Sequence, residues 1–305
     1  MTTLVFGHKS PDTDSTGSAI VWAWYLDHMG TKAEARLLGT PNTEAAFVAK
    51  HWGFELPPLL GDLAAGQKVV IVDTNNPAEL PETINAADIT AIIDHHKLVG
   101  GLETAGPIDI TIRPLACTAT LMYMLMGAHG GHAPDGIKGL MLSCIISDTL
   151  AFRSPTTTDT DRQVAERLAR ELGVDIPTLA DAMFAAKSDV SRFSDAELLR
   201  MDSKEYTVAG KDLRVSVLET TSPRIVLDRK DSLMRTMTDV AREDGADQVL
   251  LFVVDILNEE ATLLVPNDLV KTIAEKSFGA TVTGDTVVLP GIMSRKKQII
   301  PNLKL

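Results

Sequence analysis

The chain has 305 residues, of which 45% are hydrophobic and 23% charged, so it is long enough for two domains that each bury an ordinary core. Its formal net charge of −12 argues against nucleic acid as a partner, because nucleic-acid binding usually rests on a basic surface that releases counterions. Met1 leads into an apolar run without the pattern of a leader peptide, and no run has the length of a membrane span. We therefore expect a cytoplasmic protein with no membrane partner. Cys117 and Cys144 have no CxxC partner, which favours buried thiols over a disulfide framework or a thiolate metal site.

Short β-branched runs alternate with amphipathic helical patterns up to about Lys187, which predicts a mostly parallel sheet flanked by helices. The predicted strands are 4–6, 35–38, 69–72 and 90–93, and the predicted helices are 15–28, 43–51, 118–126, 137–146, 159–172 and 176–186. A polar segment rich in small residues, 188–195, predicts a hinge linker between a domain of residues 1–187 and a smaller one of residues 196–305. Strands predicted at 206–208, 213–218, 248–256 and 261–265 favour an α/β domain with a mixed sheet there.

The segment that follows the first predicted strand carries a histidine and two acids, His8, Asp12 and Asp14, where a dinucleotide-binding protein would have glycines. If this loop is extended, Asp12 and Asp14 point the same way and can serve neighbouring cations. The alternative is that Asp14 and Ser15 cap the following helix and that Asp12 begins a Pro-Asp turn.

Acids and histidines also end later elements. Asp73 follows a buried strand, at the end where α/β enzymes place reactive groups. In Asp94-His95-His96, adjacent side chains of an extended segment face opposite ways, so one histidine is expected to bind a metal and the other to face the substrate, with Asp94 orienting them. Asp148 ends an apolar helix, where a carboxylate is costly unless it is paired or bound to a cation.

Two imidazoles and four carboxylates are too many ligands for one ion, so we predict two ions that share a bridging carboxylate, for which Asp73 is the candidate. Mixed nitrogen and oxygen ligation suits Mn²⁺ or a similar ion, and the ligand types do not exclude zinc. The predicted ligands are His8, Asp12, Asp14, Asp73, His95 and Asp148. Bound cations would also let an acidic chain hold a small anion.

Basic residues cluster at Arg295-Lys296-Lys297 after a predicted strand and turn, and they can hold phosphate oxygens. Lys204 is a weaker candidate for the same role. His129 and His132, in a glycine-rich loop, have a spacing that could bind metal, but a solvated loop explains them as well.

The segments GHKSPDTDS from Gly7, VDTNN from Val72, DHH from Asp94, SDTLAFRSPTTTDTD from Ser147 and SRKKQ from Ser294 resemble those of the family II, manganese-dependent inorganic pyrophosphatases of the DHH phosphoesterase superfamily. The resemblance covers essentially the whole chain. It implies a DHH catalytic domain, a DHHA2-type substrate-binding domain and an active site in the cleft between them.

By the same resemblance, His8, Asp12 and Asp73 match the ligands of one metal, and the other metal is matched by Asp14, Asp73, His95 and Asp148. The residues that match substrate contacts are His96, Lys204, Arg295 and Lys296. The family further implies two Mn²⁺ or Co²⁺ per subunit, Mg²⁺ or Mn²⁺ that accompanies the substrate, and a homodimer joined through the N-terminal domain. The length leaves no room for the nucleotide-binding insert of some relatives, which predicts no adenine-nucleotide control. Ser10 and Thr74 stand where many relatives have Asn and His, which bears on fine geometry and rate.

These expectations lead to a hypothesis: a water or hydroxide that bridges the two ions attacks pyrophosphate in line and releases two phosphates. Lys204, Arg295 and Lys296 would neutralise phosphoryl charge, His96 would donate to the leaving group, and the linker would close the site. One alternative is a phosphoesterase for short polyphosphates or small nucleotides, although aromatic residues make up only 5% of the chain. Another is a metal- or phosphate-binding regulator without turnover.

Overall fold

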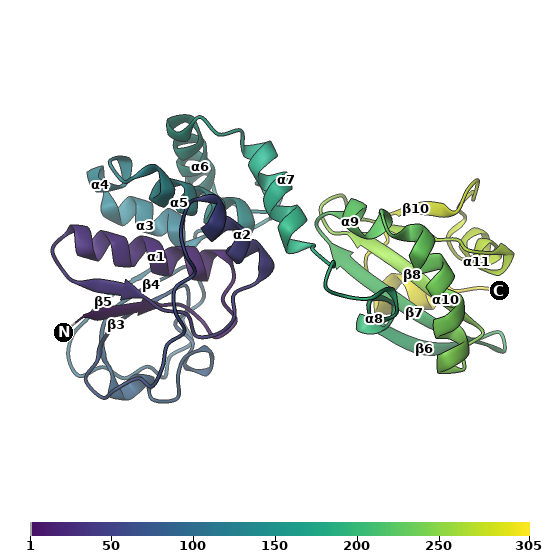
Figure 1. Ribbon diagram of the computed structural model, residues 1–305, viewed down its shortest axis with the longest axis horizontal. Coiled ribbons are helices and arrows are strands. Elements are labelled where there is room, and N and C mark those ends of the chain that lie inside the picture. Colours follow the sequence, from purple (N-terminus) through teal and green to yellow (C-terminus); the bar gives the residue numbers. More distant parts are fainter. Residues whose placement is uncertain (1) are drawn as a thin grey trace. The chain divides into compact units, whose positions relative to one another are not determined.

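The computed structural model describes residues 2–305 and divides into two units, Met1–Lys187 and Ser188–Leu305 (Figure 1). The expected fold class is confirmed, because unit 1 holds a parallel sheet with helices and unit 2 holds a mixed sheet. None of the helices in the described part of the chain is long and apolar enough to cross a membrane.

The parallel sheet of unit 1 has the strand order β2-β1-β3-β4-β5. Its strands are β1 (Thr3–Phe6), β2 (Ala33–Ala35), β3 (Lys68–Val72), β4 (Asp88–Asp94) and β5 (Asp109–Ile112). The chain passes from β1 to an outer strand and then returns to the other side of β1, so the order reverses between β1 and β3. In open α/β sheets ligands bind outside the carboxyl ends of the strands at such a point.

The helices of unit 1 are α1 (Thr13–His28), α2 (Thr43–His51), α3 (Thr118–Met126), α4 (Ala128–Gly131), α5 (Asp135–Asp148), α6 (Asp159–Leu172) and α7 (Ile176–Lys187). Helices α1 and α3 pack on the sheet, and α5 packs on α1 (Figure 1). A core cluster joins strand residues such as Phe6 and Ile71 to Leu80, which follows a short 3-10 segment, and to Ile84, which begins another. Loops and 3-10 turns therefore cover part of the sheet where helices were expected.

The predicted helices of unit 1 all exist, within two residues at each end. The strand predicted at 35–38 is misplaced, because β2 is Ala33–Ala35 and Leu37 forms only an isolated bridge with Leu59. Strand β5 was not predicted. Its burial pattern is exposed to intermediate throughout, as befits an edge strand, and it therefore lacks a hydrophobic signal.

Unit 2 is built on the strand order β10-β9-β8-β7-β6. Its elements are α8 (Asp195–Met201), β6 (Ser203–Val208), β7 (Lys211–Thr220), α9 (Pro223–Leu227), α10 (Lys230–Asp244), β8 (Gln248–Asp255), β9 (Glu260–Leu264), α11 (Asp268–Phe278) and β10 (Thr286–Pro290). Every residue of β8 is buried, with alternate side chains in the two core clusters of the unit. One cluster includes α8 and α10, and the other includes α11 and the C-terminal residues. The sheet is therefore covered on both faces.

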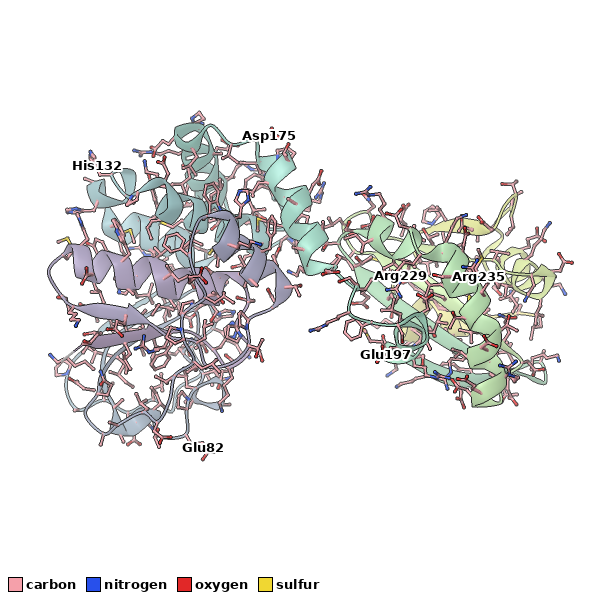
Figure 2. All side chains as sticks on the ribbon, viewed as in Figure 1. Glu82, His132, Asp175, Glu197, Arg229 and Arg235 are labelled. Carbon is pink, nitrogen blue, oxygen red and sulfur yellow. The ribbon has the colours of Figure 1, made fainter. Side chains whose placement is uncertain are left out.

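The segment predicted as a linker, 188–195, is the first part of unit 2 and packs on the rest of it. Ser188 Oγ lies 3.1 Å from Thr221 Oγ1. Arg229, labelled in Figure 2, donates hydrogen bonds to the carbonyls of Val190 and Phe193, and α8 begins at Asp195. Its action as a hinge stays a prediction.

Candidate metal centre

The carboxyl ends of β1, β3 and β4 bring four of the predicted ligands together. His8, Asp12 and Asp73 each offer a ligand atom within 4.8 Å of the others, and so do Asp73, His95 and His96. Asp73 is common to both groups, which is the position expected of a bridging carboxylate.

His8 and Asp12 lie on the turn between β1 and α1. The turn is tight at Gly7, because a Cβ there would lie 2.0 Å from Ser15 Oγ, which accepts a hydrogen bond from the His8 backbone N–H. His8 Nε2 lies 3.4 Å from Asp73 Oδ2 and 3.8 Å from Asp12 Oδ1. Asp12 is also the N-cap of α1, and its Oδ1 accepts from the Ser15 N–H. The cap of α1 is therefore Asp12, and not Asp14 or Ser15 as the capping alternative had it.

The expectation that Asp12 and Asp14 point the same way is wrong, because α1 begins at Thr13 and the backbone is no longer extended. Asp14 turns into the protein and is fully buried. Its carboxylate accepts hydrogen bonds from Ser18 Oγ and from the backbone N–H groups of Thr118 and Ala119. The two acids therefore belong to different groups of possible ligands.

Asp73 is 2% exposed and has a left-handed backbone, with φ at 58°. A non-glycine residue in this region costs on the order of 1–3 kcal/mol, and such residues cluster at functional sites. Its N–H bonds to Ile93 O, and its Oδ1 accepts from Thr118 Oγ1. The strain is therefore borne by a residue whose carboxylate lies between His8 and His95.

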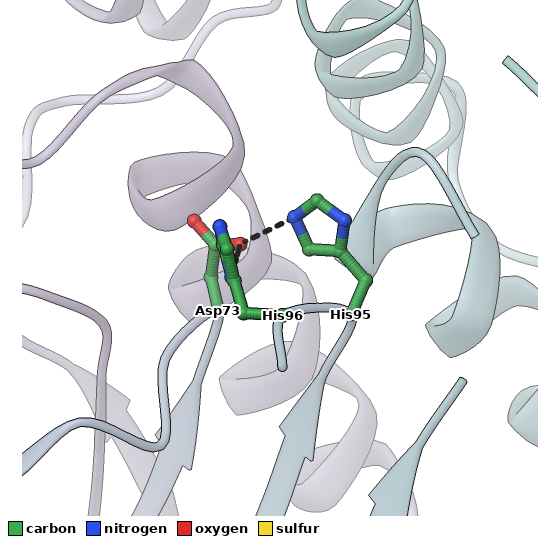
Figure 3. A group of neighbouring side chains, drawn as sticks. All are labelled: Asp73, His95 and His96. Atoms are coloured by element: carbon green, nitrogen blue, oxygen red, sulfur yellow. Dashed lines mark ion pairs between the residues drawn. The ribbon is translucent and has the colours of Figure 1, made fainter. Parts of the chain in front are cut away.

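His95 and His96 follow β4, which ends at Asp94, so the alternation expected of an extended segment does not apply to them. Their rings lie 4.2 Å apart, and Figure 3 draws the ion pairs of both with Asp73. His95 Nε2 is 3.3 Å from Asp73 Oδ1, and its Nδ1 is 3.0 Å from Leu115 O. His96 is 54% exposed, and its Nδ1 is 2.9 Å from Asp94 Oδ1. The environments of the two rings differ, although the rings do not point in opposite directions.

Asp14, which is buried, and Asp148, which is partly buried, form a second part of the site. Together with Cys117 they offer ligand atoms within 4.8 Å of one another. Asp148 Oδ2 is buried and has no hydrogen-bond partner among residues 2–305. Two adjacent carboxyls, one with a buried orphan oxygen, are unfavourable unless a proton or a cation joins them. The donor set therefore fits a divalent cation.

The charges of this cluster shift several pKa values. Burial, followed by the negative charges of Asp14 and Asp73, raises the pKa of Asp148 well above its usual value. Burial and the charge of Asp73 also raise the pKa of Asp14. Burial alone would lower the pKa of His95, but the hydrogen bond and charge of Asp73 and the charge of Asp14 raise it to about 9. The cluster therefore retains protons that a metal would displace.

Sequence reasoning missed Thr118 and Asn75. Thr118 donates to two of the predicted ligands, Asp14 and Asp73, yet it appears in the sequence only as an ordinary helix start. Asn75 is buried and donates to Asp94 Oδ2 at 2.5 Å and to Lys97 O, and it accepts from the Val99 N–H. Asn75 therefore fixes the loop that carries His95 and His96, but its position in a turn sequence gave only a turn signal.

A cavity of about 320 Å³ lies beside the centre in unit 1 and is lined by His8, His96, Ser10 and Thr74, among others. Thr74 Oγ1 donates to Glu79 Oε2 at 2.7 Å. Ser10 and Thr74 therefore border the same space as two of the site histidines.

The predicted substrate cations gather in unit 2. Lys204, Arg295 and Lys296 line one cavity of about 770 Å³. Arg295 donates to the backbone oxygen and to Oδ1 of Asp202, each at 2.7 Å, which fixes the direction of its guanidinium. The turn that carries Arg295 is tied by Gln298, which accepts from the N–H groups of residues 293 and 294 and donates to Gly291 O.

The weaker histidines are not among the possible ligand groups of the described chain. His129 packs edge-on against the rings of His28 and Tyr25, and His132 Nδ1 lies 2.8 Å from Ala128 O. Both cysteines are buried and free, and burial raises their pKa values well above the usual range. Cys117 nevertheless contributes a possible ligand atom beside Asp14 and Asp148, which the sequence did not indicate.

Comparison with known proteins covers the whole chain. Residues 2–147 match the model of the DHH family, N-terminal domain, and residues 181–305 match that of the DHHA2 domain. The chain is 43% identical to a probable manganese-dependent inorganic pyrophosphatase of Deinococcus radiodurans, over 98% of this chain and 97% of the relative. It is 36% identical to one of Lactobacillus helveticus, over the same shares of both chains.

Comparison with solved structures indicates the same family. A putative family II inorganic pyrophosphatase from Methanococcus jannaschii is 34% identical and superposes with a TM-score of 0.61, over 99% of this chain and 98% of that one. An exopolyphosphatase-related protein from Bacteroides fragilis, 13% identical with a TM-score of 0.52, shares the fold. The clustered acids and histidines thus lie in a chain similar to these proteins along its full length, and the chain belongs to the manganese-dependent, family II inorganic pyrophosphatases.

Proposed function

We propose that the chain hydrolyses inorganic pyrophosphate to two phosphates at a two-metal centre, by in-line attack of a water or hydroxide. The observation that carries the proposal is the placement of Asp73 between two groups of possible ligands, in a chain at least 33% identical over almost its whole length to relatives named as pyrophosphatases. In this proposal, His8, Asp12 and Asp73 hold one ion, and Asp14, Asp73, His95 and Asp148 hold the other.

The ions we propose are two Mn²⁺, or Co²⁺, with Mg²⁺ accompanying the substrate. When held by these ligands, such ions would lower the pKa of a bound water and stabilise charge on phosphoryl oxygens. The protein's part is to fix its ligands. Asp73 is held by its backbone bond to Ile93, and His95 by the bond from its Nδ1 to Leu115 O.

His96 is the proposed proton donor to the leaving phosphate. The hydrogen bond with Asp94 raises its pKa, which favours the protonated ring that a donor requires. Nδ1 is engaged with Asp94, and this leaves Nε2 to meet a substrate oxygen. The half-exposed side chain borders the cavity beside the centre, which is consistent with contact to a small ligand.

Lys204, Arg295 and Lys296 are proposed to hold the phosphoryl oxygens. Arg295 presents a fork already oriented by Asp202, and the lysines act as point charges. The proposal assigns the metal ligands to unit 1 and these substrate cations to unit 2. It also includes a homodimer through unit 1, for which the edge strand β5, with Ile110 56% exposed, offers an unpaired side.

The test is phosphate release by metal-stripped protein, with Mg²⁺ throughout and with or without prior incubation with Mn²⁺. We expect rapid release from pyrophosphate only after Mn²⁺ treatment. Faster turnover of tripolyphosphate or of a dinucleotide would support the phosphoesterase alternative. Tight binding of pyrophosphate without any release would support the non-enzymatic regulator.

A further inference from the structure

Glu44 is a fully buried carboxylate that has no part in the proposed chemistry. It lies in the first turn of α2, and its side chain is 0% exposed. Charged side chains are rarely buried completely unless they are paired, because the loss of hydration is costly. The partners of Glu44 therefore indicate what its charge is for.

Glu44 Oε2 joins two segments that are far apart in the sequence. It accepts a hydrogen bond from Thr13 Oγ1 at 2.9 Å and another from Ser147 Oγ at 2.7 Å. Lys187 Nζ lies 3.4 Å away and balances the charge. One carboxylate oxygen thus accepts hydrogen bonds from two hydroxyl groups, one on α1 and one on α5.

The two hydroxyl residues are the immediate neighbours of predicted ligands. Thr13 stands between Asp12 and Asp14 at the start of α1, and Ser147 precedes Asp148 at the end of α5. Helices α1 and α5 already pack on each other, so the two hydrogen bonds to Glu44 are not needed to bring them together. These bonds lie next to Asp14 on α1 and Asp148 on α5, which belong to one group of possible ligands.

The other carboxylate oxygen of Glu44 takes no part in these bonds. Its Oε1 is buried and has no hydrogen-bond partner among the described residues. If packing were the only requirement, a neutral or apolar side chain would avoid the free-energy cost of burying an oxygen without a hydrogen-bond partner. A charged carboxylate has the advantage that it accepts strong hydrogen bonds from both hydroxyls at once.

We propose that Glu44 is a positioning residue of the metal centre, which raises its affinity for metal by fixing the Asp12–Asp14 segment relative to Asp148. The proposal rests on the metal site of the proposed function. Residues that orient metal ligands from behind typically change metal affinity or activity by about 10- to 100-fold when they are replaced.

The experiment is a calorimetric titration of metal-stripped protein with Mn²⁺ alone, without pyrophosphate. Glu44→Gln keeps the shape of the side chain and one acceptor oxygen but removes the charge that strengthens both hydrogen bonds, so we expect Mn²⁺ affinity to fall by about 10-fold. Thr13→Val and Ser147→Ala each remove one hydroxyl and leave Glu44 in place, so each is expected to cause a smaller loss. These two variants keep the test informative if Glu44→Gln does not fold.

The control is Asp255→Asn in unit 2. Asp255 is also a buried carboxylate that accepts from neighbouring groups, in this case at the turn after β8. We expect its replacement to lower the melting temperature and to leave Mn²⁺ affinity unchanged, which separates a loss of stability from a loss of positioning.

Wild-type Mn²⁺ affinity in folded Glu44→Gln, or in both hydroxyl variants, would overturn the proposal even if their melting temperatures fell. The outcome is independent of catalysis, because no substrate is present. A wild-type chain that binds Mn²⁺ but releases no phosphate would refute the proposed function and leave the role of Glu44 intact. A wild-type chain that binds no Mn²⁺ would refute both.

Discussion

At the scale of single residues, Asp73 combines several properties that the site requires. It pairs with histidines from two different segments, it is almost fully buried, and its backbone is left-handed. A strand-end acid was visible in the sequence, whereas the backbone conformation was not, because it depends on the neighbouring strand that accepts its N–H.

Replacement of Asp73 separates its conformation from its charge. Asparagine also tolerates the left-handed region, so we expect Asp73→Asn to fold with a near-native circular dichroism spectrum. Mn²⁺-dependent phosphate release should nevertheless fall at least about 100-fold, more than is typical when an outer hydrogen-bonding partner is lost. A kcat/KM for pyrophosphate within a few-fold of wild type would rule out Asp73 as the bridging ligand.

The protonation of His95 predicts how metal binding depends on pH. Its pKa in the metal-free fold is about 9, because Asp73 and Asp14 outweigh the effect of burial, and a metal needs the neutral ring. Apparent Mn²⁺ affinity should therefore rise from pH 6.5 to about 9 and then level off. Titrations in buffers of different ionisation heat should show proton release at pH 7, and an affinity that is flat across this window would contradict the assignment.

The same shift has the opposite effect on the stability of the metal-free protein. The folded pKa of His95 lies above the value of 6.5 expected in the unfolded chain, so its contribution is complete below pH 6.5 and is lost as the pH rises to about 9. Metal-free protein should thus lose this contribution over the window in which metal affinity grows.

At the scale of elements, sequence patterns found the helices of unit 1 well and some elements not at all. The helix 159–172 was recognised from its strong amphipathic pattern, and it has a capping box and a left-handed glycine at its end. Helix α8, which begins at the last residue of the predicted linker, was not predicted, although Ser194 and Glu197 form a capping box that could have revealed it. For β5 there was no such signal.

The candidate site also combines features that a local sequence pattern predicts with features that it does not. The candidate ligands could be chosen from strand and helix ends, because parallel strands deliver those ends to one edge of the sheet. The helical turn that buries Asp14, the proximity of the two histidine rings and the contacts of Thr118 depend on tertiary packing, which no local pattern encodes.

The turn after α5 carries a strain that is testable. Leu150, Ala151 and Phe152 are three successive non-glycine residues with φ between 49° and 70°. Left-handed conformation costs on the order of 1–2 kcal/mol per residue, and glycine avoids it at a smaller entropic cost. We expect Ala151→Gly to raise the free energy of unfolding by about 0.5–1 kcal/mol, a melting-temperature gain of roughly 1–4 °C.

The matched control is Ala182→Gly inside α7, where glycine should lower stability by about 1 kcal/mol. Thermal unfolding of both variants in the metal-free state would decide the matter. A fall in melting temperature for Ala151→Gly equal to that of the control would show that the turn is not strained.

At the scale of the whole molecule, the two units divide the proposed work. The candidate metal ligands all belong to unit 1, and three of the four proposed substrate contacts, Lys204, Arg295 and Lys296, belong to unit 2. Bound cations in unit 1 and a local basic cluster in unit 2 would both offset the net charge of −12 for an anionic ligand.

This division predicts that substrate handling can be damaged without loss of metal. Arg295→Ala should lower kcat/KM for pyrophosphate by about 10²–10³, the usual effect of losing one stabilising donor. Mn²⁺ affinity and stoichiometry, measured by calorimetry, should stay at wild-type values. Unchanged turnover would remove Arg295 from the site, and a loss of bound Mn²⁺ would show that the units are not independent in metal binding.

The central claim is a pair of ions that share Asp73, and the most direct test is the number of Mn²⁺ ions bound per chain together with their magnetic coupling. We predict two tightly bound Mn²⁺ in the wild-type protein, with the spin-coupled paramagnetic resonance spectrum of a bridged pair, and loss of that coupling in Asp73→Asn. One ion per chain, or two uncoupled ions in the wild-type protein, would contradict the account.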